Sequence, residues 1–107
     1  MKRIKVSGTT YLAEIVRIDR WLNTQQVLRL LTSRGLRPGT REELKAYLKQ
    51  HHEDLRGGCT TALGTVNEGD SPVYDDFFPK HKGEKKMGSW PYNQDYLRGC
   101  TFIGIKE

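Results

Sequence analysis

The chain contains little cysteine: only two of its 107 residues are cysteines. Neither Cys59 nor Cys100 belongs to a Cys-x-x-Cys pair, so the sequence argues against a structural zinc site. Both cysteines sit in a Gly-Cys-Thr tripeptide that opens an apolar run. If the two runs form neighbouring strands, the sulfur atoms could lie close together. The alternative is two separate buried thiols, the usual state in a reducing compartment.

Long hydrophobic runs are also missing. No stretch approaches the ~20 apolar residues that a membrane-spanning helix needs. The basic start at Met1 is not followed by the apolar segment of a secretion signal. We therefore expect a cytoplasmic protein with no membrane partner. The length predicts a single domain over residues 1–107, and an apolar share of 36% suits a globular chain with a modest core.

Recognisable catalytic motifs are absent as well. The chain has no Gly-x-Ser-x-Gly, no phosphate-binding P-loop and no dinucleotide-binding glycine pattern. His51 and His52 are adjacent on an expected helix, where neighbours point about 100° apart, so they do not converge on a metal. Asp75 and Asp76 would face opposite sides of a strand. We expect no catalytic residue, metal site or cofactor, although an active site assembled from distant segments would leave no local motif.

What the chain does have is an excess of positive charge. Lys and Arg number 18 against 13 Asp and Glu, which gives a formal net charge of +5 and a pI near 9.4. A basic balance favours polyanionic partners, which include nucleic acids, acidic proteins and membrane surfaces. Charge alone does not choose among them.

The most strongly specified local structure is a joint between two helices at residues 33–44. Gly35 follows an apolar periodic run and can take the left-handed conformation that closes a helix. Pro38 prevents simple continuation of that helix. Thr40 and Glu43 have the spacing of a capping box, which begins a second helix.

The remaining pattern predicts the fold class. Apolar residues at helical spacing indicate the two helices, and Asn23 with Gln26 caps the first. Strand patterns occur at Lys2–Val6 and at residues 11–18, 60–66, 73–78 and 97–106. We predict an α+β protein with two consecutive helices packed on a small antiparallel sheet. Both helices are expected to cover one side of a sheet built mainly from the C-terminal half, with the basic first strand at an edge.

The joint also carries a family resemblance. Arg-Gly-Leu-Arg-Pro-x-Thr-x-Glu-Glu-Leu at residues 34–44, Ala-Leu-Gly at 62–64 and Phe-Ile-Gly-Ile-Lys at 102–106 occur in this order. They resemble a family of small uncharacterised bacterial proteins in which the corresponding pieces run roughly RGLRPAT-x-EEL, VALGS and RFLAVRK. The resemblance covers residues 16–107, is specific at the joint and is loose between 67 and 96. It implies no activity.

More distantly, the joint is similar to that of C-type-lectin-like domains of the sulfatase-modifying-factor type. The matching positions are Leu36, Arg37, Pro38, Thr40 and Glu43. The chain departs from the family at Leu44, where the family has tryptophan, and in the extra Gly39. The likeness implies two helices flanking a small twisted sheet, with a ligand surface on the loops before the last strands. It does not imply catalysis, because Cys59 and Cys100 lack the close spacing of the formylglycine-generating cysteines.

Two candidate surfaces follow. We predict a non-catalytic module that binds a protein or another ligand through residues 80–96. Trp90 and Tyr92 would anchor the contact, since aromatic side chains carry much of the energy of such surfaces. Asn93 and Asp95 would supply orienting polar contacts.

The alternative is a nucleic-acid-binding protein that combines a basic run near aromatic residues with the second helix. Its contact residues would be Lys80, Lys82, Lys85, Lys86, Arg41 and Lys45. Against a groove-reading helix, Glu42 and Glu43 occupy its first turn, where they suit the helix dipole better than a phosphate. The basic run is equally well explained as a solvated loop.

Overall fold

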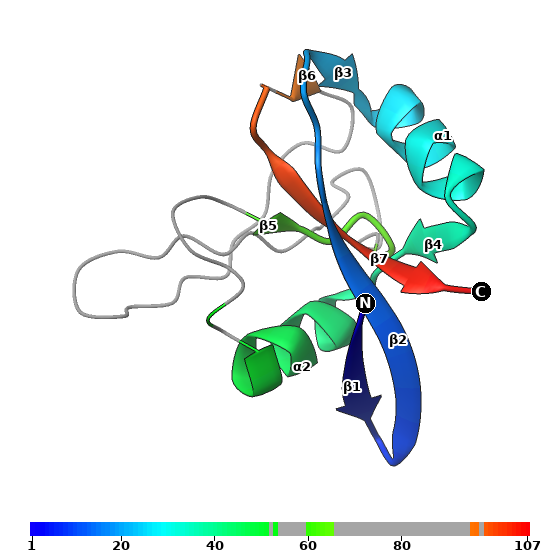
Figure 1. The fold of residues 1–107 in the computed structure, drawn as a ribbon, viewed down its shortest axis with the longest axis vertical. Helices are drawn as coiled ribbons and strands as arrows, with labels where there is room; N and C mark the ends of the chain where they lie inside the picture. The colour runs from blue at the N-terminus through cyan, green and yellow to red at the C-terminus, as the bar shows by residue number, and fades with distance from the viewer. Residues whose placement is uncertain (52, 54–59, 66–94, 97) are drawn as a thin grey trace.

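The computed structural model describes residues 1–51, 53, 60–65, 95–96 and 98–107 of the chain. Its strands are β1 (Lys2–Val6), β2 (Thr9–Arg17), β3 (Leu22–Asn23), β4 (Leu36–Pro38), β5 (Thr60–Thr61), β6 (Asp95–Tyr96) and β7 (Thr101–Lys106). The helices are α1 (Thr24–Ser33) and α2 (Arg41–His51). Two helices with a mostly antiparallel sheet confirm the predicted α+β class (Figure 1).

The main sheet has the strand order β1-β2-β7-β4, with every neighbouring pair antiparallel. β5 joins β7 in parallel, and β3 pairs with β6 in a separate small sheet. β1 lies at an edge, as its alternating basic and apolar residues predict. Three of the five strands precede residue 40, so the expectation of a mainly C-terminal sheet is wrong.

β1 and β2 form a hairpin with a two-residue turn. Ser7 and Gly8 both have positive φ, 49° and 83°, as in the turns whose twist matches that of the flanking strands. Ile4 is buried, and Val6 packs against the same cluster, so the predicted inward face of β1 is confirmed. β2 then runs as one long strand past both helices (Figure 1).

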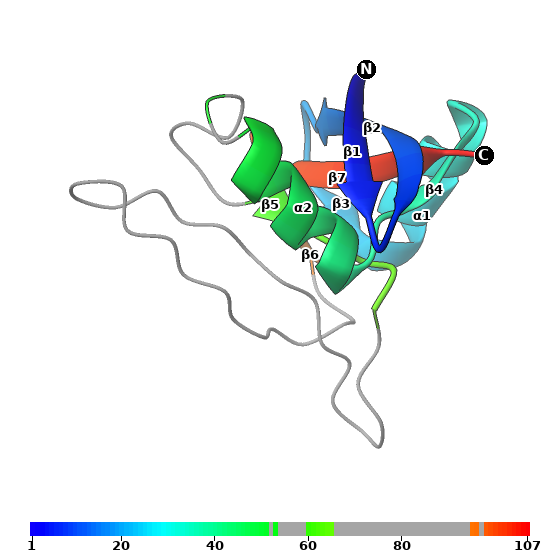
Figure 2. The same cartoon turned by 90° about the horizontal axis from the view of Figure 1, so that it is seen from below.

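The two helices cover different faces of the sheet. Ile103 of β7 is buried in a cluster with Leu44 of α2, whereas Phe102 is buried in a second cluster with Leu31 of α1. Successive side chains of a strand point to opposite faces. α1 and α2 therefore lie on opposite sides of the sheet, as Figures 1 and 2 also show, and the expectation that both cover one side is wrong.

The reason lies in the joint, which holds a strand as well as a turn. Arg34 ends α1, and Gly35 follows with φ of 72°, the left-handed conformation predicted for it. The next three residues then extend as β4 against β7. Pro38 favours this, because the residue before a proline is pushed towards extended conformations. Three extended residues carry the chain about 10 Å along β7 before the second helix begins.

Both predicted helix starts are confirmed. Asn23 accepts a hydrogen bond from the amide of Gln26 at 2.9 Å, and the Gln26 side chain accepts one from the amide of Asn23 at 2.9 Å. The Thr40 hydroxyl accepts from the amide of Glu43 at 3.3 Å, and the Glu43 carboxylate accepts from the amide of Thr40 at 2.9 Å. Each box satisfies two amides that a helix start leaves free.

Two glycines allow the chain after the joint to pack closely. A Cβ at Gly39 would lie 2.7 Å from the Cγ2 atom of Ile103, and one at Gly64 would lie 2.6 Å from the carbonyl oxygen of Pro38. The Gly64 amide donates to the Gly39 carbonyl at 2.8 Å. The close backbone approach predicted at Gly64 is confirmed, and Gly39, which departs from the lectin-like motif, has a packing reason.

Several predicted features lie outside the described residues. These are the end of the second helix near Gly57, the strand at 73–78, Cys59 and most of the region from 80 to 96. The two Gly-Cys-Thr runs do lead into neighbouring strands, because Thr60 of β5 faces Thr101 of β7, their hydroxyls 2.8 Å apart. Neither described helix is long and apolar enough to cross a membrane.

Candidate anion-binding groove

The structure tests the position of only three predicted site residues. Trp90, Tyr92, Asn93, Lys80, Lys82, Lys85 and Lys86 lie outside the described residues. Asp95 is exposed on β6, opposite Asn23 of β3. Arg41 and Lys45 both lie on α2, Arg41 partly buried and Lys45 exposed. β6 and α2 lie at opposite ends of the molecule in Figure 1, so Asp95 and Lys45 do not belong to one site.

A shallow open groove of about 720 Å³ lies between the turn of the β1–β2 hairpin and the outer side of α2. We call it the lysine groove. It is lined by Lys5, Val6, Ser7, Gly8, Glu42, Lys45, Ala46, Lys49 and Gln50. Sequence reasoning had placed Lys45 on a contact surface but had missed Lys5, because the hairpin is far from the helix in the chain.

The amphipathic pattern of α2 explains where its lysines lie. Lys45 and Lys49 are one helical turn apart and share a side of the helix, and both are exposed. Leu44 and Leu48 precede them by one position each and are buried against the sheet. Lys5 is exposed on the edge strand, so two separate elements bring three ammonium groups to the lysine groove.

These three charges are not neutralised by the described part of the protein. Its side-chain ion pairs include those of Arg20 with Asp19, Arg34 with Glu14 and Arg37 with Glu43, and no lysine of the groove belongs to one of these three. Glu42 is the single acidic residue in the lining given above. The lysine groove therefore carries a local excess of positive charge.

The side chains of Gln50 and His51 hold this wall of the groove in place. The Gln50 carboxamide accepts from the Lys5 amide and donates to the Lys5 carbonyl, both at 3.1 Å. It thus pairs with the strand edge as a peptide group of another strand would. His51 Nε2 lies 2.7 Å from the Arg3 carbonyl oxygen, which only accepts, so this nitrogen carries the proton. Three hydrogen bonds fix the position of Lys5 relative to α2.

A second charged cluster lies at the joint, and its charged groups pair with each other. The Arg37 guanidinium donates to both oxygens of the Glu43 carboxylate, at 2.9 and 2.6 Å. It also lies 5.6 Å from the centre of the Tyr11 ring. The Glu43 side chain is only 5% exposed and accepts a further hydrogen bond from Thr40. All of these groups are engaged with one another, which suits a structural role.

The pKa values at the joint follow from this geometry. Burial alone raises the pKa of Glu43, but the hydrogen bonds from Arg37 and Thr40, with the charge of Arg37, bring it below the ordinary carboxyl value. The hydrogen bond to Glu43 raises the pKa of Arg37 despite an opposing effect of burial. Both groups are therefore held in their charged forms.

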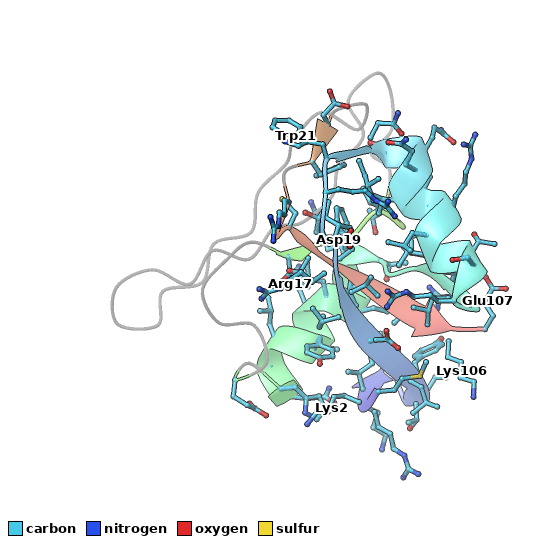
Figure 3. All side chains as sticks on the ribbon, turned by 45° about the horizontal axis from the view of Figure 1, so that its top comes forward. Lys2, Arg17, Asp19, Trp21, Lys106 and Glu107 are labelled. Atoms are coloured by element: carbon cyan, nitrogen blue, oxygen red, sulfur yellow. The ribbon has the colours of Figure 1, made fainter. Side chains whose placement is uncertain are left out.

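Trp21 is a feature that sequence reasoning missed. Its side chain is 64% exposed and projects outward beside β6 (Figure 3). It directly precedes β3, whose partner strand carries Asp95. The loop surface predicted at Trp90, Tyr92, Asn93 and Asp95 stays a prediction, and Trp21 is an exposed aromatic residue that precedes the strand paired with its one described member. No periodic pattern signals an isolated exposed aromatic residue.

Comparison of the chain with protein-family models, with curated proteins and with solved structures finds no match. The resemblances read from the joint therefore stay predictions. Among the described residues no group of three or more His, Cys, Asp or Glu side chains is placed to hold a metal ion.

Proposed function

We propose that this protein is a non-catalytic binding module whose partner is a polyanion held in the lysine groove. The observation that carries the proposal is the convergence of Lys5, Lys45 and Lys49, from two elements, on one concavity with no compensating ion pair among the described residues. Unpaired charges gathered in a concave surface raise the local concentration of oppositely charged ligands.

The chemistry of the lining supports binding rather than catalysis. It contains no histidine or cysteine, and its one amide side chain, Gln50, is already bonded to the backbone of Lys5. Lysine ammonium groups are strongly hydrated point charges with flexible stems. They suit attraction and loose positioning of an anion better than the exact placement of a reacting group.

The magnitudes decide between a small anion and a polyanion. An exposed ion pair contributes about 0.2–1 kcal/mol, whereas association costs at least about 4 kcal/mol in lost freedom of motion. Three such pairs at one carboxylate or phosphate do not repay that cost. A chain of negative charges can reach all three lysines at once, gains further from the release of its own bound counterions and has many equivalent ways to bind.

The test is a matched pair of charge-reversal variants on immobilised heparin, eluted with rising salt. Lys45→Glu with Lys49→Glu removes two charges of the lysine groove, and Arg17→Glu with Arg29→Glu makes the same change in net charge at exposed positions of β2 and α1. The proposal expects the first variant to elute at much lower salt than the second. Equal losses would show that net charge, and not the lysine groove, causes retention, and would overturn the proposal.

A further inference from the structure

Resting on the proposed function, we infer that the polyanion is the phosphate backbone of a nucleic-acid duplex, bound without reading its base sequence. The lysine groove supplies the cations, and its lining explains both the preference for phosphate and the absence of sequence recognition. The inference moves the nucleic-acid surface away from the basic run at residues 80–86 and onto the α2–β1 side of the fold.

The spacing of the basic residues fits a repeating backbone. Lys45 and Lys49 are four residues apart on a helix, about 6 Å along its axis. Arg3 and Lys5 are two residues apart on a strand, about 6.7 Å along it, and both are exposed. Phosphates of one strand of a duplex advance 3.4 Å each along the axis and also rotate around it, so the basic rows set no exact register. Each row presents charges in series, which a repeating backbone can follow because lysine side chains are flexible.

The lining of the groove lacks the aromatic and arginine side chains that would anchor an acidic protein partner. Its apolar members are Val6 and Ala46, and no aromatic side chain or arginine is among its residues. Protein interfaces draw most of their energy from buried aromatic and arginine anchors. Binding to a phosphate backbone needs no such anchor, since its affinity comes from neutralised phosphates and released counterions.

The same lining explains why bases would not be read. Single-stranded sites stack bases on aromatic rings, and the lining has none. Glutamine reads adenine through both ends of its carboxamide, but in Gln50 both ends are bonded to the backbone of Lys5. Contacts to phosphate position a protein on a duplex and carry no sequence information.

The distribution of charge along the chain agrees with this location. The described residues hold 13 of the 18 basic side chains and 7 of the 13 acidic ones. Residues 66–94 hold four lysines and five acidic residues. The basic excess thus belongs to the described part, and the run at 80–86 is offset by acidic neighbours in sequence.

The experiment is a titration of a fluorescein-labelled duplex of about 20 base pairs, followed by anisotropy from about 50 to 200 mM salt. Three phosphate contacts predict a slope of about −2.7 for the logarithm of the binding constant against that of the salt concentration. Lys45→Ala, Lys49→Ala and Lys5→Ala should each reduce that slope by about one contact. Arg29→Ala on α1 is the control and should leave it unchanged. A duplex of scrambled sequence should bind equally well.

Two competitors and the lysine variants separate the outcomes. Polyglutamate that displaces the duplex at equal concentration of charge would overturn the inference in favour of an acidic protein, while leaving the proposed polyanion groove standing. A single strand that binds more tightly than the duplex would overturn it in favour of base stacking. A duplex whose binding is insensitive to the lysine variants would also overturn it. If neither the duplex nor polyglutamate nor heparin binds, the proposed function fails with it.

Discussion

Two charged regions on α2 differ in how their charges are satisfied. At the joint, Glu43 and Arg37 form two hydrogen bonds with each other, and the carboxylate also caps the helix. Further along the helix, Lys45 and Lys49 carry charges with no ion-pair partner among the described residues. We call the first the closed region, because its charged groups pair with each other inside the fold. We call the second the open region, because its ammonium groups are exposed to solvent.

The difference is one of burial. A charge taken out of water is costly unless it is paired and hydrogen-bonded, so Glu43, 5% exposed on its side chain, needs all of its partners. A lysine left in water costs almost nothing to keep unpaired. Net charge alone therefore does not identify a binding surface, which becomes visible only when the internally paired charges have been set aside.

The largest effect should come from breaking the closed region. Glu43→Ala removes the partner of a half-buried guanidinium and one half of the capping box, and we expect it to lower the free energy of unfolding by about 3 kcal/mol. Urea denaturation followed by circular dichroism measures this. The matched control is Glu42→Ala, at the neighbouring exposed position of the same first turn, where a loss below about 0.5 kcal/mol is expected.

Equal effects of the two alanine variants would contradict the closed-region account, because the exposed carboxylate of Glu42 lacks these contacts. Glu43→Gln refines the measurement, since it keeps one acceptor oxygen but loses the charge and one of the two hydrogen bonds from Arg37. Its loss should lie between those of the other two variants.

A smaller effect follows from the lowered pKa of Glu43. A carboxyl whose pKa is lower in the folded than in the unfolded state adds stability above its ordinary pKa, and this is lost as the pH falls through the folded value. The stability gap between the wild-type protein and Glu43→Gln should be constant at neutral pH and narrow in acid below the ordinary carboxyl range. Urea denaturation at a series of pH values tests this, and a gap that widens in acid would reverse the assignment.

The sequence predicts the joint well because its determinants are local. Gly35, Pro38 and the Thr40–Glu43 box each act within a few residues, so spacing alone is enough to recognise them. The hairpin strand β1 and the central strand β7 are also recovered, since alternation and β-branched content mark them. The ion pair between Arg37 and Glu43 is harder to predict from the sequence, because it depends on β4 being extended.

The lysine groove and the placement of the helices could not be predicted in the same way. Gln50 contacts Lys5 across 45 positions of the chain, and no local pattern encodes such a pairing. Amphipathic helices reveal that each has a buried side, but not which face of the sheet it meets. That choice depends on β4, whose three residues read as part of a turn until their pairing with β7 is known.

The smallest effect should come from the open region, and it sharpens the comparison most. Lys45→Ala with Lys49→Ala removes two exposed charges that the described fold does not pair, and alanine favours a helix at least as well as lysine. Lys49 lies in the last turn, where its charge complements the helix dipole by a few tenths of a kcal/mol. We expect the free energy of unfolding to change by less than about 0.5 kcal/mol, measured in urea beside the wild-type protein. A loss above about 1 kcal/mol would mean that these lysines stabilise the fold and are not held for a partner.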